Sequence, residues 1–368
     1  MTQTSPTIPD AAVPVESKKE RIRRFSLAGR NLQSVALIPV IIAVCILGAL
    51  ISPHFFTPTN IINNVLALSA PLAILVIAES VILIGGYFDL SLQSTVGFSV
   101  MVFAVLITAP ATGTRGYGLP LPVALLITLG VVLLIGLLNG FFVSVLKLNA
   151  FIVTLAMLIL IQGVTLGISN GQTYTDLPGF VLWLGTASVF GLPIQAVIFV
   201  GAFALGAVIM RFTPTGRGLY AMGGSIEAAR AAGLNIRRLT FGLFVVGSLM
   251  AMLAGLMLAA QTSVATASLG NNIIFTVFAA AVLGGIDLNG GRGTLVGAAL
   301  GVLLLSIIQN ILTLSNVPSF WINAAYGVII LGALLIGRVS AMYSHLRQIS
   351  SRRRPADSLA PPTTTSAP

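Results

Sequence analysis

Long apolar stretches alternate with short polar connections over most of this chain. Ten of the stretches approach the roughly 20 residues that a helix needs to cross the apolar core of a bilayer. They lie near 34–51, 64–84, 91–109, 121–146, 150–168, 192–210, 241–260, 271–286, 294–312 and 321–337. The pattern predicts an all-α, polytopic membrane protein of about ten transmembrane helices.

One further apolar segment, 177–190, is shorter than the rest. A stretch of this length is typical of an interfacial or re-entrant segment rather than a full crossing. We expect Trp183 to lie at the depth of the lipid headgroups, where tryptophan is enriched.

The amino-acid composition agrees with a membrane protein. Apolar residues make up 56% of the chain and charged residues only 8%, whereas a soluble domain has roughly 25% charged residues. So few charges could not cover a globule of this size with solvated surface. The bilayer must therefore solvate most of the chain.

The charges are distributed unevenly along the predicted topology. The chain has 19 Lys and Arg and a net charge of +10. With ten spans, 18 of these basic residues fall on one side of the membrane, in segments 1–33, 85–90, 147–149, 211–240, 287–293 and 338–368, and Arg115 is the exception. Because Lys and Arg favour cytoplasmic loops, both termini are predicted to be cytoplasmic, in a multi-pass protein of the cytoplasmic (inner) membrane. This explanation of the positive charge leaves no reason to expect a nucleic-acid partner.

The same topology divides the chain into three parts. Residues 1–33 and 338–368 form cytoplasmic tails, and 34–337 form the transmembrane domain. The longest cytoplasmic loop of that domain is 211–240.

The chain lacks the residues for most kinds of catalysis. Its one cysteine, Cys45, and its two histidines, His54 and His345, are too dispersed for a metal site. No Gly-x-x-x-x-Gly-Lys-Ser/Thr motif is present, so the chain cannot bind ATP through a P-loop. We therefore expect no enzyme activity, metal or cofactor of its own. If ATP drives transport, ATP–Mg binds to a partner ATPase.

A few polar residues lie inside the predicted spans. Glu79 is the one clear ionisable residue there, and a carboxyl group at membrane depth is a functional candidate. Alternatively, it extends toward the interface, remains protonated, or forms a hydrogen bond with Ser80 or a neighbouring helix. Three amides are further candidates for lining a solute pathway: Asn139, Gln162 and Asn310.

Glycines recur within the spans at the spacing that lets helices approach closely. Gly136 and Gly140 form one small-xxx-small pair, and Gly297 and Gly301 form another. This spacing predicts helix packing and carries no information about the substrate.

Two predicted cytoplasmic corners have paired glycines followed by an aspartate. In 85–91 (GGYFDLS), the glycines end a helix and Asp89 or Ser91 can cap the next one. Alternatively, the corner interrupts a span, and its free backbone groups line the pathway. Asp287 occupies the same place in 284–293 (GGIDLNGGRG). Asp89, Ser91 and Asp287 are therefore further candidates for the pathway or its gate.

The loop 211–240 contains a pattern for one short helix. Ser225 is a suitable N-cap, Glu227 and Arg230 match the helix dipole, and Gly233 ends the helix. Its body consists largely of alanines: Ala228, Ala229, Ala231 and Ala232. A helix with such small side chains could fit a cleft in a partner, or it could be an ordinary surface helix.

Together these three stretches resemble the permease subunits of ribose/xylose/arabinose-type ABC importers. The corner Gly86–Ser94 is similar to their G-G-I-D-L-S-V-G-S motif, with Tyr87 and Gln93 in place of two glycines. Gly224 and the run from Ala228 to Leu234 match their coupling segment, and Val282–Gly293 matches a late glycine-rich motif; Ile226 replaces an asparagine.

This resemblance covers about residues 35–340 and implies an assembly. It implies a permease dimer, two cytosolic ATPases docked on residues 223–234, and an external binding protein that delivers a sugar. Membrane lipid surrounds such a permease. The residues implied in ATPase coupling are Gly224, Glu227, Ala228, Ala229, Arg230 and Gly233.

Two other functions remain open at this point. One is an ion-coupled secondary transporter that uses Glu79 or Asp89 as its proton or ion site. The other is an ABC permease for nucleosides or branched-chain amino acids. The Asp-Leu-Ser corner and the Ala-Ala-Arg loop favour a pentose or related monosaccharide.

Overall fold

The computed structural model describes residues 37–110, 115–322, 324–329 and 331–332. The tails 1–33 and 338–368 and seven of the 17 residues of the expected tenth span, 321–337, lie outside these residues. After a helix over Leu37–Ile51, the elements are η1 (a π-helix, Asn60–Ala67), α2 (Ala70–Ile84), α3 (Ser91–Ile107), α4 (Leu121–Ser144), α5 (Ala150–Ser169), α6 (Gly179–Thr186), β1 (Ser188–Val189), β2 (Leu192–Pro193), α7 (Ile194–Phe212), α8 (Pro214–Gly224), α9 (Ile226–Ala231), α10 (Ile236–Thr262), α11 (Ile273–Leu283) and α12 (Leu295–Leu314).

The helical membrane fold expected from the sequence is confirmed. Among the described residues, five helices are long and apolar enough to cross a bilayer, namely α4, α5, α7, α10 and α12, and η1 with α2 forms a bent sixth. Helix α11 has 11 residues, too few for a crossing, and α3 has 17, at the lower limit of the length that can span a bilayer. The count of ten spans thus stays a prediction.

The expected single helix over 64–84 is two helices that meet at 41°. Pro71 lies in the first turn of α2, where it has no N–H to continue the ladder of the preceding helix. The Ser69 hydroxyl donates to the carbonyl oxygen of Val65 at 2.6 Å, which satisfies a backbone group near the break. Pro71 and the Ser69 side chain, which bonds to the backbone of the preceding helix, together account for the bend.

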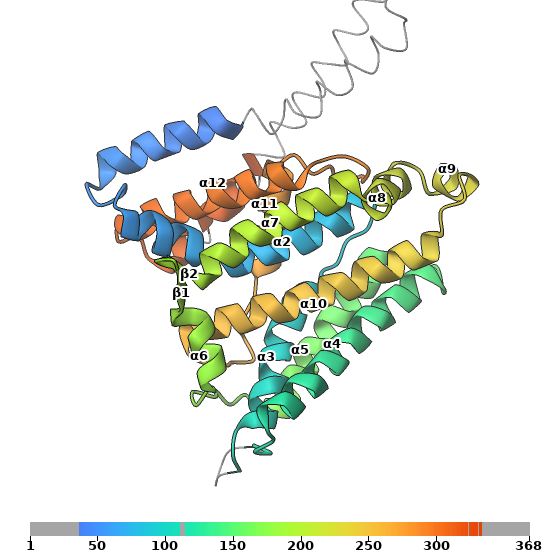
Figure 1. Cartoon of the computed structure of the whole chain (residues 1–368), viewed down its shortest axis with the longest axis horizontal. Helices are drawn as coiled ribbons and strands as arrows, with labels where there is room; N and C mark the ends of the chain where they lie inside the picture. The colour runs from blue at the N-terminus through green and yellow to red at the C-terminus, as the bar shows by residue number, and fades with distance from the viewer. Residues whose placement is uncertain (1–36, 111–114, 323, 330, 333–368) are drawn as a thin grey trace, which may run out of the picture.

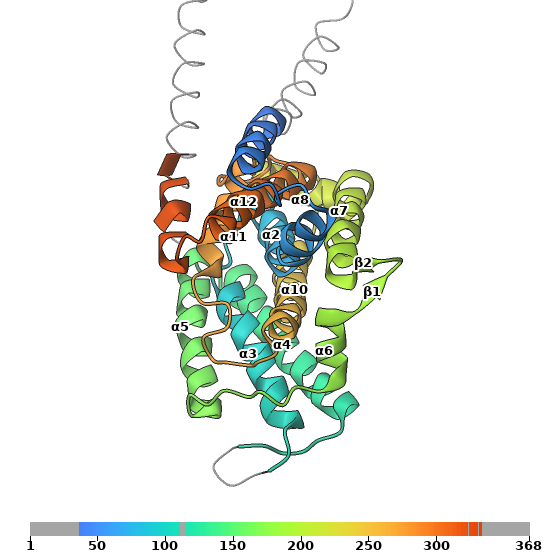
Figure 2. The same cartoon turned by 90° about the vertical axis from the view of Figure 1, so that its left-hand side faces the viewer.

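Helix α10 lies at the centre of the bundle, between α4 and the pair α2 and α3 (Figures 1 and 2). In its most apolar stretch 67% of residues are buried, against 28% in α4, α5 and α7. The outer helices therefore expose Leu, Ile, Val and Phe side chains, as expected of a surface in contact with lipid.

The small-xxx-small pairs lie where helices approach closely, as predicted. A Cβ atom on Gly136 would lie 2.7 Å from the Cα of Val245 on α10. A Cβ atom on Gly301 of α12 would overlap the carbonyl oxygen of Ala280 on α11. Both contacts require glycine because no side chain fits between the two backbones.

Segment 177–190 does not form a full crossing. Helix α6 has eight residues, which corresponds to a length of about 12 Å. It leads into the antiparallel strands β1 and β2, joined by a turn in which Phe190 and Gly191 have φ angles of +53° and +77°. Trp183 on α6 is 50% exposed.

The two ends of the bundle differ in charge. Seven of the eight described Lys and Arg residues lie at the end that carries α8 and α9 (Figure 1). Arg115 lies at the opposite end, where its guanidinium donates to the carbonyl oxygen of Gly167 at 3.2 Å. The charge asymmetry predicted from the sequence is therefore present in the folded chain.

Candidate transport and coupling sites

A chain of buried polar groups links α2, α3 and α4. The Asp89 backbone N–H donates to Glu79 Oε1 at 3.3 Å, and the Ser91 N–H donates to Asp89 Oδ1 at 2.9 Å. Asn139 on α4 completes the chain by donating from Nδ2 to Ser91 Oγ at 2.9 Å. Four of the residues proposed from the sequence are thus brought together.

This polar cluster is defined by Glu79, Asp89, Ser91 and Asn139, and none of the four is more than 1% exposed. Glu79 Oε2, Asp89 Oδ2 and Asn139 Oδ1 have no hydrogen-bond partner in the described part of the chain. Burial of such groups costs free energy, which the hydrogen bonds offset only in part. In this conformation the hydrogen bonds of the cluster are made within the protein. They fix the position of the Asp89 corner against α2 and α4.

The Asp89 carboxylate satisfies a backbone group at the start of α3, although it lies one residue before the N-cap, Leu90. It accepts from the backbone N–H and the hydroxyl of Ser91, the first residue of α3. Just before it, α2 ends at Ile84, and Gly86 turns the chain with a φ angle of +86°. The paired glycines therefore end the helix as predicted.

Three glycine-rich segments that are distant in sequence meet at the end of α2. The Gly291 N–H donates to the carbonyl oxygen of Ile84 at 2.9 Å. A Cβ atom on Gly290 would lie 2.8 Å from the Cα of Gly86, and one on Gly223 would overlap the Ile84 carbonyl oxygen. We call Gly86, Gly223, Gly290 and Gly291 the glycine junction. It joins the three stretches that the sequence singled out.

Helix α9 follows directly after this junction and has the predicted caps. The Ser225 hydroxyl accepts from the Ala228 N–H at 3.2 Å, and Gly233 ends the turn with a φ angle of +82°. Of the helix body only Ala229 is buried, at 2% exposure. Glu227, Ala228 and Arg230 are exposed, and so is Gly224 just before the helix. The result is a low, exposed helix at the end of the bundle (Figure 1).

The remaining predicted pathway residues lie elsewhere. Asn310 on α12 exchanges two hydrogen bonds with Asn60 of η1, at 2.8 and 2.9 Å. Asp287 accepts from the backbone and side chain of Asn289 and so closes a turn. Gln162 lies half-buried on α5 and belongs neither to the polar cluster nor to the Asn60–Asn310 pair.

Comparison with known proteins decides the family. The family model described as the permease component of the branched-chain amino acid transport system matches residues 61–339. A probable ABC transporter permease, YphD of Escherichia coli K12, is 33% identical over 87% of this chain and 93% of its own length. The ribose import permease RbsC of Haemophilus influenzae is 32% identical over 87% and 96%, and the xylose transport permease XylH of Escherichia coli K12 is 28% identical over 91% and 98%. No solved structure matches.

The chain belongs to this permease family. It is an ABC permease of the ribose/xylose type, as the sequence motifs suggested, and a transporter subunit rather than an enzyme. This assignment decides against the ion-coupled transporter hypothesis.

The permease has a polar pocket that the sequence reasoning missed, at the end opposite to α9. The cavity measures about 520 Å³ and is lined by Asn63 and Asn64 of η1, Gln195 of α7 and Gln261 of α10, among others. Gln261 Nε2 donates to Gln195 Oε1 at 2.6 Å, which links the two helices. These amides are 132 or more residues from Asn63 in sequence, so only the fold reveals their proximity.

Proposed function

We propose that this chain is the permease subunit of an importer for a pentose or related monosaccharide, driven by separate ATPase subunits that dock on α9. The observation that carries the coupling proposal is the position of α9. It is an exposed helix of small side chains that continues directly from the glycine junction. A force on α9 would act on the backbone at Gly223, which contacts the end of α2 and the segment before α12.

The polar pocket at the end opposite to α9 favours a neutral substrate. Amide side chains both donate and accept hydrogen bonds, as sugar hydroxyls do. Among the described residues, its lining contains no Asp, Glu, Lys or Arg. Charged side chains are the usual partners of a buried ammonium or carboxylate group, so a lining without them favours a sugar over an amino acid.

Site-directed cross-linking tests the docking of the ATPase. Because Cys45 is the only cysteine, a Cys45→Ser background allows single reporter cysteines. Ala228→Cys on α9 should cross-link to the ATPase, whereas Ser188→Cys at the opposite end should not. Equal cross-linking at both positions, or at neither, would disprove the docking site.

Transport by the complete system tests the substrate. Uptake of labelled ribose or xylose should be inhibited by related pentoses and not by leucine, while adenosine tests the nucleoside alternative. Replacing Gln261 with Ala should raise the KM for the sugar more than it lowers kcat, because the amide is proposed to bind substrate. Inhibition by leucine as strong as that by ribose would refute a sugar pathway.

The assembly and topology belong to the same proposal. We infer a permease dimer in the inner membrane, an external sugar-binding protein, ATP–Mg on the ATPase, ten spans and cytoplasmic termini. The sided arrangement of Lys and Arg supports this orientation. Cysteine labelling with an impermeant reagent tests it: Ser188→Cys should react from outside, and Ala228→Cys only after the membrane is opened.

A further inference from the structure

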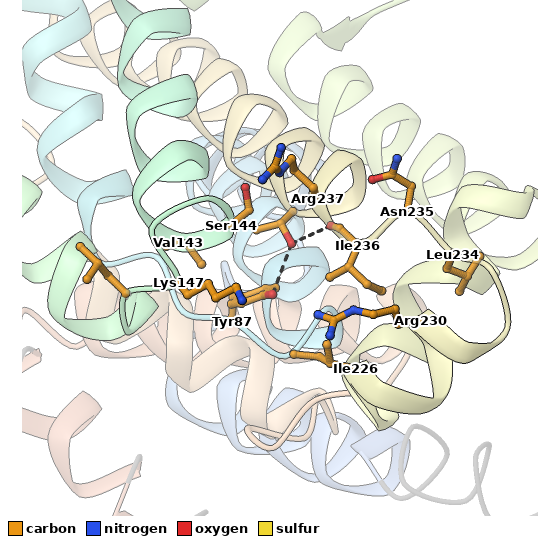
Figure 3. A pocket seen from close by; sticks show the side chains of 12 residues that line it. Tyr87, Val143, Ser144, Lys147, Ile226, Arg230, Leu234, Asn235, Ile236 and Arg237 are labelled. Carbon is orange, nitrogen blue, oxygen red and sulfur yellow. Dashed lines mark hydrogen bonds between the residues drawn. The ribbon is translucent and has the colours of Figure 1, made fainter.

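A second cavity, of about 570 Å³, lies between α9 and the adjacent ends of α4 and α10 (Figure 3). Three cations line it, from the loop after α4, from α9 and from α10: Lys147, Arg230 and Arg237. Hydroxyl groups of Tyr87, Ser144 and Thr240 add to its polar lining. We call this cavity the basic pocket.

The cations of the basic pocket are not neutralised by its other lining residues. Among the described residues, no Asp or Glu lines the cavity. In Figure 3, Lys147 and Arg230 reach toward one another, and the hydrogen bonds drawn join Thr240 to Tyr87 and to the backbone of Ile236 without involving the cations. Ser144 Oγ is buried without a hydrogen-bond partner in the described chain. The pocket therefore offers positive charge and a hydroxyl group to an anion.

An apolar groove adjoins this pocket. It measures about 350 Å³, lies between α4 and α5, and shares Leu148 with the basic pocket. Phe142, Ile152, Ala156 and Met157 line it. Ile152 is 65% exposed, and nearby Phe151 is 48% exposed, as on a lipid-facing surface. A cationic pocket and an apolar groove thus meet at one residue.

We propose that these two cavities form a binding site for one anionic glycerophospholipid, with its phosphate in the basic pocket and an acyl chain in the groove. A phosphate group matches the charge of the lysine and arginines, and basic pockets between helices on the cytoplasmic side suit lipid headgroups. The groove explains why the ligand is a lipid rather than a free anion. An acidic surface of the docked ATPase could reach the cations, but it would leave the membrane-facing groove empty.

Native mass spectrometry of the purified full-length permease, without its ATPase, tests this proposal. The protein is mixed with equal amounts of phosphatidylglycerol and phosphatidylcholine that have the same acyl chains. Wild type should retain phosphatidylglycerol preferentially, and Lys147→Gln or Arg237→Gln should each lower that preference about fivefold. The control Arg238→Gln removes an exposed arginine from the same helix, outside the pocket lining, and should leave the preference unchanged.

A second variant distinguishes a lipid from a free phosphate. Ala156→Trp should fill the groove, so retention of both phospholipids should fall while binding of glycerol 3-phosphate stays the same. The proposal is overturned if wild type shows no preference for phosphatidylglycerol, if Arg238→Gln has the same effect as Lys147→Gln, or if glycerol 3-phosphate competes as well as the lipid. If wild type shows no preference alone and gains one when the measurement is repeated with the ATPase bound, the pocket belongs to the ATPase interface and the lipid proposal is overturned.

Discussion

Gly223→Ala should destabilise the permease and uncouple it from its ATPase, because Gly223 has no room for a side chain. The added methyl group would overlap the carbonyl oxygen of Ile84 and lie 2.5 Å from the backbone nitrogen of Gly291. These two atoms form a hydrogen bond, so the methyl group must push apart the bonded pair. Overpacking costs about 1–3 kcal/mol and the lost hydrogen bond about 1 kcal/mol, so we expect a loss of about 2–4 kcal/mol.

Gly224→Ala, one residue along the same helix, is the matched control for stability; because Gly224 is itself implied in ATPase coupling, the coupling of Gly223→Ala is compared with wild type. A Cβ atom there would have no neighbour within 4 Å, and alanine is a better helix former than glycine. Reversible unfolding in mixed detergents measures the stability of both variants, and sugar-stimulated ATP hydrolysis by the reconstituted complex measures coupling. Equal stability of the two variants would refute the argument that the glycine junction is tightly packed, and wild-type coupling in Gly223→Ala would refute the argument that the junction connects α9 to the bundle.

Three other perturbations follow from the site geometry. Glu79→Gln keeps an oxygen that can accept from the Asp89 N–H, so ATP-driven sugar uptake should persist; loss of uptake with normal folding would point to an essential carboxylate. Ser225→Ala removes the cap of α9 and should lower the stability by about 1 kcal/mol and reduce sugar-stimulated ATP hydrolysis. Ser225→Asp should preserve the stability and the ATP hydrolysis; the same losses in both variants would argue against the cap. A double-mutant cycle of Asn60→Ala and Asn310→Ala should give a coupling energy of about 1–2 kcal/mol in unfolding experiments, and additive effects would contradict the paired amides.

Local signals allowed much of the fold to be predicted. The caps of α9 depend on residues within eight positions of one another, from Ser225 to Gly233, and each takes its expected place. The sided distribution of Lys and Arg likewise reflects a rule that acts on each loop separately. The bend before α2 was missed because apolar periodicity alone continues through Ser69 and Pro71.

The contacts between distant segments could not be predicted in the same way. Asp89 and Asn139 were both candidates, yet their connection through Ser91 depends on how α4 packs against α3. The pocket amides Gln195 and Gln261 resemble many other polar residues near helix ends. Hydropathy records that such residues are polar, and it contains no information about which helices are neighbours.

Helix α10 begins at Ile236, three residues after Gly233 at the end of the α9 turn, and reaches Thr262 beside the amide-lined pocket. Its 27 residues give a rigid rod about 40 Å long. A rod of this length acts as a lever: a tilt of about 5° at the α9 end would displace Gln261 by about 3.5 Å. That distance exceeds the 2.6 Å hydrogen bond between Gln261 and Gln195. A tilt of this size would therefore break the polar contact at the opposite end of the bundle.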